Sequence, residues 1–295
     1  MLRSAFYIFM ASVFWGTLPL FTKFLYQNGA SALEAAAMRA YLAAVVYLIV
    51  FGAIKRKLAG VRLKELPFYL GFGSITITGI FVFYALALKE LSSAMAVILL
   101  YTAPAFVTIL SRFIYKEKIN GHKLAGLILT VGGCFLVVKG YDPEAMKGSF
   151  KGIFYGLMSG LCYCMLTIIA KKGLTKHSPQ VNSTMNTTCG ALVFLLICPP
   201  WTITVDGPTM FFGFLGLAVF GTVFPSLFYF MGLERGLDLG QASILASLEP
   251  FFATLFGFFL LHESLAVPQV FGLGLTLLGA VLPVSRGTAK SAAGS

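Results

Sequence analysis

Charged side chains are scarce in this sequence. Only 11% of its 295 residues are charged, whereas 58% are hydrophobic. A soluble domain carries about 25% charged residues, so this chain has too few of them to cover a surface that faces water. The composition therefore excludes an ordinary soluble domain and predicts an integral membrane protein.

The residues that enzymes use at metal and phosphate sites are also few. The three histidines fall at the ends of predicted helices, and no carboxylate cluster with metal-ligand spacing accompanies them. A glycine-rich phosphate loop is missing, and the five cysteines lie inside apolar runs without the spacing of a zinc site. We therefore expect no enzyme, no metal site and no cofactor. A membrane-embedded enzyme or receptor is the less favoured alternative class.

Long apolar runs fill most of the chain. A membrane-spanning helix needs about 20 mostly apolar residues, and the sequence holds ten runs of this kind, without the alternating pattern of a membrane barrel. The first run lacks a convincing cleavage site, so we expect it to be retained as a helix. The predicted all-α protein has helices at 5–26, 31–54, 66–88, 93–114, 122–139, 150–172, 180–199, 208–233, 239–261 and 267–284, and a disordered tail at 287–295.

The basic residues are distributed unevenly between the predicted loops. If successive helices alternate in direction, 16 of the 22 lysines and arginines fall on the side of both termini, and only five on the other side. Arg39 remains inside the membrane. The positive-inside rule then predicts an inner (plasma) membrane protein with both termini in the cytoplasm. The positive net charge marks topology in the lipid bilayer, and we expect no nucleic-acid partner.

One stretch of the sequence occurs twice, at 91–137 and again at 237–283, with a constant offset of 146 residues. The matched pairs include Pro104 and Pro250, Glu117 and Glu263, Gly126 and Gly272, and Gly133 and Gly279. The basic residues around the first turn have no basic counterparts in the second. Five helices in each half is an odd number, so the second half must be upside down. The sequence predicts two inverted five-helix repeats, 1–141 and 146–286.

Several short motifs carry a resemblance to a known family. They are Phe14-Trp15-Gly16, Arg39, the run from Ala94 to Pro104, Glu117 with its two glycines, and the matching Glu249-Pro250 and Glu263. With these motifs the chain resembles the drug/metabolite transporter superfamily, in its ten-helix EamA branch, over roughly 5–282. The resemblance implies an alternating-access carrier of a small molecule, with a cavity lined by the first four helices of each half. The fifth helices would be peripheral and would form the contact of a homodimer. Family members move many different solutes, so the resemblance does not specify the substrate.

Two charged residues are predicted near the centre of the bilayer. Arg39 lies about 12 Å from the outer face and Glu249 about 15 Å from the inner face, at 1.5 Å per helical residue. A charge at this depth is costly and usually faces a cavity or a partner. Their repeat counterparts are Asn186 and Ala103, an asymmetry that suits an asymmetric ligand. A small amino-acid-like zwitterion is the favoured substrate, and an organic cation bound by Glu249 and aromatic rings is the alternative. Both residues also fit the family pattern, so a structural role is an equal interpretation.

Further residues on the cavity-forming helices are candidates for substrate binding, with packing as the alternative for each. They are Trp15, Tyr84, Tyr101, Tyr163, Tyr229 and, in an unusually polar helix, Asn186. Pro104 and Pro250 are expected to loosen their helices where gates bend. Glu117 and Glu263 are expected to cap the helix that follows each of them.

Overall fold

The structure is a computed structural model that describes residues 2–54, 60–144 and 146–292. These ranges form helices and turns and contain no β-sheet. Seven helices in them are long and apolar enough to cross a membrane, which confirms the prediction of an all-α membrane protein. They are Leu2–Gln27, Ala32–Gly52, Leu63–Glu90, Ser93–Ile114, Phe150–Leu174, Gly207–Glu234 and Leu239–Leu261.

The first half of the chain begins with two helices that meet at Thr17, two residues before Pro19. Ser31 and Glu34 form a capping box at the start of the following helix. Irregular turns with π-helical hydrogen bonding interrupt several helices. In order the elements are α1 (Leu2–Gly16), α2 (Leu18–Gln27), α3 (Ala32–Tyr47), η1 (Leu48–Ile54), η3 (Leu63–Glu65), α4 (Leu66–Gly73), η4 (Ser74–Gly79), α5 (Ile80–Glu90), α6 (Ser93–Leu100), α7 (Ala103–Ile114) and α8 (Gly121–Val137).

The second half of the chain has the same kinds of element. They are α9 (Phe150–Leu174), α10 (Pro179–Phe194), η5 (Pro200–Thr202), α11 (Gly207–Ala218), η6 (Val219–Val223), α12 (Phe224–Glu234), α13 (Leu239–Ala246), α14 (Glu249–Leu261) and α15 (Val267–Ala292). The starts of α6, α7 and α8 differ by 146 residues from the starts of α13, α14 and α15. In both halves the helix is interrupted just before its proline, because Pro104 and Pro250 occupy the first turn of α7 and α14. Proline is well tolerated there, since the first amides have no partner within the helix.

Two predicted boundaries are wrong. The helix expected at 180–199 ends as α10 at Phe194, where turns lead into the Pro199-Pro200 pair. The tail expected to be disordered from residue 287 continues α15 as a helix to Ala292. This segment contains Ala289, Lys290 and Ala292, and both residue types are good helix formers. Residues 293–295 of the predicted tail lie outside the described residues.

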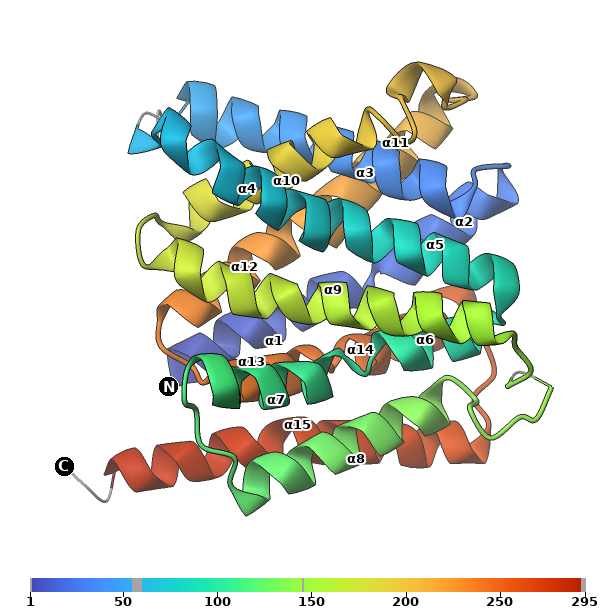
Figure 1. The fold of residues 1–295 in the computed structure, drawn as a ribbon. Helices are drawn as coiled ribbons and strands as arrows, with labels where there is room; N and C mark the ends of the chain where they lie inside the picture. Colours follow the sequence, from blue (N-terminus) through green and yellow to red (C-terminus); the bar gives the residue numbers. More distant parts are fainter. Residues whose placement is uncertain (1, 55–59, 145, 293–295) are drawn as a thin grey trace.

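The helices run side by side in a bundle, with both chain ends at the same end of it (Figure 1). We call this the termini end, and the other the opposite end. α8 and α15 form a separate pair at one edge of the bundle (Figure 1). Their backbones come so close that a Cβ atom on Gly133 would overlap Thr276, and one on Gly279 would overlap Thr130. Small residues that let helix backbones approach are typical of packing in membranes.

The polar helix α10 lies inside the bundle. Asn182, Ser183 and Thr187 are completely buried, and the helix packs against α3, α4 and α12. Its two asparagines bond neighbouring elements: Asn182 accepts from the Tyr69 hydroxyl at 3.2 Å and Asn186 from the Thr76 hydroxyl at 2.9 Å. Such bonds between helices are typical where lipid offers no hydrogen-bonding partner.

Candidate functional site

A cavity of about 460 Å³ lies between helices of the two halves. Six of the eight residues predicted to bind substrate line it, namely Trp15, Arg39, Tyr84, Tyr101, Tyr163 and Glu249. They come from both halves of the chain, from positions up to 234 residues apart in the sequence. The fold therefore brings together side chains that are far apart in the sequence.

Arg39 projects from α3 into this cavity and is only 6% exposed. The small side chains of Ala35, Ala36 and Ala40 line the cavity beside it and leave room around the guanidinium. Its Cζ atom lies 3.8 Å from the centre of the Phe81 ring, a cation–π contact. The ion pairs between described residues do not include Arg39. The guanidinium is thus a buried cation that still has donors to offer an anionic group.

Glu249 is the first residue of α14, directly after the interruption that separates α14 from α13. A carboxylate is stabilised at this position by the helix dipole. The Tyr101 side chain lines the same cavity and interacts with this carboxyl group. Within the described ranges, Glu249 also forms no ion pair. The cavity therefore holds one basic and one acidic side chain, and in the part of the chain that the structure describes neither lies within 4.0 Å of an oppositely charged protein group.

Aromatic rings form part of the cavity wall. The Trp15 ring stands edge-on to Tyr163 with 6.2 Å between ring centres, and lies 5.4 Å from Tyr229. Tyr229 is buried behind Trp15, and its hydroxyl lies 2.6 Å from the Thr167 hydroxyl. Tyr229 is therefore not among the side chains that line the cavity.

Asn186 is likewise set behind the cavity wall. It is buried on α10, and its side-chain oxygen accepts a hydrogen bond of 2.9 Å from the Thr76 hydroxyl. Thr76 lines the cavity, whereas Asn186 does not. In this structure Asn186 is therefore connected to the cavity through Thr76.

Two residues of the cavity escaped the sequence analysis. Phe81, beneath the Arg39 guanidinium, is one of 29 phenylalanines and had no distinguishing signal. Tyr26, near the end of α2, also lines the cavity. It is the last residue of the helix predicted at 5–26 and was not singled out in the sequence.

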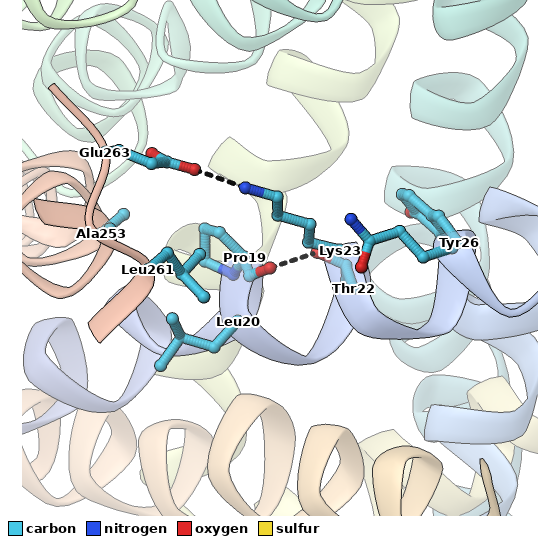
Figure 2. A pocket seen from close by; sticks show the side chains of 10 residues that line it. Pro19, Leu20, Thr22, Lys23, Tyr26, Ala253, Leu261 and Glu263 are labelled. Carbon is cyan, nitrogen blue, oxygen red and sulfur yellow. Dashed lines mark hydrogen bonds and ion pairs between the residues drawn. The ribbon is translucent and has the colours of Figure 1, made fainter.

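A second pocket of about 420 Å³ adjoins the cavity (Figure 2), because both are lined by Pro19, Thr22, Tyr26 and Ala253. In it, Lys23 on α2 reaches Glu263, with 2.7 Å between Nζ and Oε1 (Figure 2). Both side chains of this ion pair are about half exposed. These segments lie at the opposite end of the bundle (Figure 1). The cavity therefore continues toward the opposite end.

The termini end is closed by a buried cluster of charges. The Glu117 carboxylate accepts hydrogen bonds from the backbone N–H of Leu239, at 3.0 and 3.1 Å, and lies 3.1 Å from Lys171 Nζ. Lys123 is 2% exposed and lies 2.5 Å from Asp238 and 3.7 Å from Glu117. Glu117 was predicted to cap the helix that follows it. It caps α13 instead, while Asn120 caps α8.

The two acids of this cluster differ in acidity. Burial acts to raise the pKa of Glu117, but hydrogen bonds from the Leu239 amide, from Asp238 in its protonated form and from Lys171 together lower it below its ordinary value. For Asp238 burial prevails and raises the pKa, although Lys123 opposes the change. Glu117 is therefore the acid that stays ionised in the closed contact.

Three comparisons with known proteins bear on the site. The model of the EamA-like transporter family matches residues 2–139 and again residues 150–285. A relative from Archaeoglobus fulgidus, named as an uncharacterized transporter, is 30% identical over 230 residues, which cover 75% of this chain and 81% of the relative. Another from the same organism, with the same name, is 26% identical over 275 residues, 92% of this chain and 95% of the relative.

The fold also has a counterpart among solved structures. A crystal structure of a protein 17% identical in sequence superposes with a TM-score of 0.80, over 95% of this chain and 96% of the other. At this identity the likeness shows the fold alone. The two family matches cover nearly all of the chain, and its apolar helices agree with them. The chain therefore belongs to the EamA-like transporter family, within the drug/metabolite transporter superfamily, and is a multi-pass membrane transporter.

Proposed function

We propose that this protein is a secondary active transporter that moves a small amino-acid-like zwitterion by alternating access through the central cavity. One observation carries the proposal. Arg39 and Glu249 line the same cavity, and among the described residues neither has an ion-pair partner.

The cost of burying charge favours a zwitterion. A buried ion is expensive unless an opposite charge or several hydrogen bonds compensate it. A solute with one carboxylate and one ammonium group offers a partner to each: the carboxylate to Arg39 and the ammonium to Glu249. The rings of Trp15 and Tyr163 would contact the apolar part of the solute.

The proposed mechanism includes the ten-helix, inverted-repeat architecture, with repeats at 1–141 and 146–286. Two observations support it: the constant offset between α6–α8 and α13–α15, and the separate family match to each half. The distribution of basic residues supports an inner-membrane location with cytoplasmic termini. The described structure would then be open to the outside. Pro104 and Pro250, at the helix interruptions, are the proposed hinges. A homodimer would use the outer faces of α8 and α15, where Ile128 and Phe271 are exposed.

An organic cation is the second candidate substrate. Glu249 shares its cavity with six aromatic side chains, and such rings bind cations on their faces. For this substrate Arg39 would organise the cavity and would not contact the solute.

Matched ligands distinguish the two candidates. We would measure thermal stabilisation of the purified protein by a panel of amino acids, by the amines that lack their carboxylate, and by the N-acetyl derivatives that lack their cation. The hits would then be tested for flux into liposomes. We expect the zwitterion to stabilise the protein and to be transported, and both derivatives to be weaker. An amine that matches its parent amino acid would favour the cation, and binding without flux would contradict a transporter of that solute.

A further inference from the structure

Glu117 closes the termini end of the bundle by binding the first amides of α13. Its carboxylate accepts from Leu239 N–H and lies 3.5 Å from the amide nitrogen of Gly240. Lys171 on α9 and the buried Lys123 add positive charge beside it. The Glu117 side chain is only 9% exposed. The turn between α7 and α8 is thereby fastened to the second half of the chain.

The same parts exist at the opposite end. At the repeat offset of 146, Glu263 corresponds to Glu117, and the start of α6 corresponds to the start of α13. The two short helices are even capped alike: Asp238 accepts from the amide of Gln241, and Ser92 accepts from the amide of Met95. A lysine accompanies each glutamate, Lys171 on α9 and Lys23 on α2.

Only one of the two equivalent contacts is formed. α7 packs against α13 at the termini end, whereas α14 has no comparable packing against α6 in the described ranges. Leu239 is buried, but its counterpart Ser93 lines the open cavity. Glu263 is 49% exposed, and its hydrogen-bond partner is Lys23 on the rim of the second pocket (Figure 2).

We propose that Glu117 and Glu263 are alternating latches of the transport cycle. In the state described here, Glu117 holds the termini end closed. In the other state Glu117 releases α13, and Glu263 binds the backbone amides of Ser93 and Ala94 at the start of α6, which closes the opposite end. This inference rests on the proposed alternating-access mechanism, but not on the identity of the substrate.

The amide of Ser93 can be removed without removing the helix. Ser93 is the first residue of α6, where proline is tolerated, and the preceding Ser92 is already extended, as proline requires. Ser93→Pro therefore deletes the proposed donor, and Glu263→Gln removes the charge of the acceptor. Leu239→Pro and Glu117→Gln are the matching variants for the contact that exists. Lys23→Gln removes only the exposed ion pair, which contributes little free energy.

Distances between spin labels in the full-length protein in nanodiscs test the proposal. One label pair at Lys89 and Ser264 reports the opposite end, and another at Lys118 and Glu234 reports the termini end; all four residues are exposed. We expect Glu263→Gln and Ser93→Pro each to reduce the population closed at the opposite end about tenfold, the effect of losing one charge-assisted hydrogen bond. The double variant should lose no more than either single variant. Glu117→Gln and Leu239→Pro should increase that population, and Lys23→Gln should change it less than twofold.

Three results would overturn the latch. If Lys23→Gln and Glu263→Gln changed the closed population equally, Glu263 would act only through its ion pair with Lys23. An unchanged population in Ser93→Pro, with a loss in Glu263→Gln, would place the docking site elsewhere. In both cases alternating access would stand. If no variant shows a second distance between the spin labels at either end, the protein has only one state, and alternating access fails together with the latch.

Discussion

Arg39 and Glu249 line one cavity from the two halves of the chain, yet they form no ion pair with each other. Had they been within 4.0 Å, the simplest account would be a structural ion pair that joins the halves. Because they are apart, the Arg39 guanidinium lies against the Phe81 ring and the Glu249 carboxyl group interacts with Tyr101. A charged solute that enters the cavity can then pair with each of them. The contributions of Arg39 and Glu249 to ligand binding can therefore be measured one at a time.

The first prediction concerns these two charges and the solute groups they contact. Arg39→Gln should weaken binding of the zwitterion about tenfold or more, because a charge-assisted hydrogen bond is lost, while binding of the corresponding amine should change little. Glu249→Gln should weaken binding of both ligands. Thermal-shift titrations of the purified variants provide the affinities. Arg112→Gln and Glu144→Gln, at exposed positions, are the matched controls.

These measurements distinguish three possibilities for Arg39 and Glu249: no role in the site, a structural role, and contact with the solute. Normal binding and transport by both variants would exclude the central charges from the site. If both variants failed to fold, the structural interpretation of these residues would hold, and the aromatic side chains would become the better candidates. Loss of amine binding in Arg39→Gln would contradict the assignment of Arg39 to the carboxylate of the solute.

The sequence predicted the apolar helices well, because these depend on local patterns. A run of about 20 apolar residues has few alternatives in a membrane, and Pro104 and Pro250 lie at the helix interruptions in both halves. The site was predicted in part. Trp15 and Tyr229 are equally aromatic in the sequence, but only the structure shows that one lines the cavity and the other stands behind it.

The contact between Glu117 and the start of α13 could not be predicted from the sequence, for another reason. Glu117 is followed by a helix, so a local cap was the natural expectation. Its partner, the amide of Leu239, is 122 residues away. The burial of Lys123 was not foreseen either, because a lysine near a turn is usually exposed. Contacts between distant segments depend on how the helices pack, and a single sequence does not record this.

The second prediction tests the orientation in the membrane. A cysteine at Gly60 should react with an impermeant maleimide only from the cytoplasmic side, and one at Asp206 only from the outside. Asp206 is preferable to Gly207, whose φ of 83° favours glycine. The five native cysteines are buried and should give little background. Labelling of both positions from one side would contradict the inverted repeat.

The third prediction concerns the α8–α15 pair and has a control one residue away. Gly133→Ala should destabilise the protein by about 1–3 kcal/mol, because the new methyl group would overlap Thr276 and the backbone of α15. Gly132→Ala places the same group on the same helix in open space, and should be neutral or stabilising by up to about 1 kcal/mol. Thermal unfolding in detergent measures the difference. Equal melting temperatures would show that this close approach is not required for stability.

The last prediction concerns the pH dependence of the charge cluster at the termini end. In the wild type, the lowered pKa of Glu117 means that its contribution to stability is complete above its ordinary value of 4.5 and is lost as the pH falls through the lowered value. The raised pKa of Asp238 acts in the opposite sense, since its ionisation in this site costs free energy as the pH rises.

Lys123→Met removes the cation that offsets this cost. The variant should lose about 2–3 kcal/mol at pH 8, somewhat less than the ~3–5 kcal/mol of a completely buried pair, because the Asp238 side chain is 27% exposed. Without Lys123 the pKa of Asp238 should rise further, so that protonation relieves its repulsion from Glu117 at a higher pH. The deficit in melting temperature relative to wild type should therefore shrink between pH 8 and pH 5. Lys118→Met, at an exposed position of the same turn, should show no such trend. A deficit that stays constant or widens on acidification would mean that Lys123 does not hold the two carboxylates together.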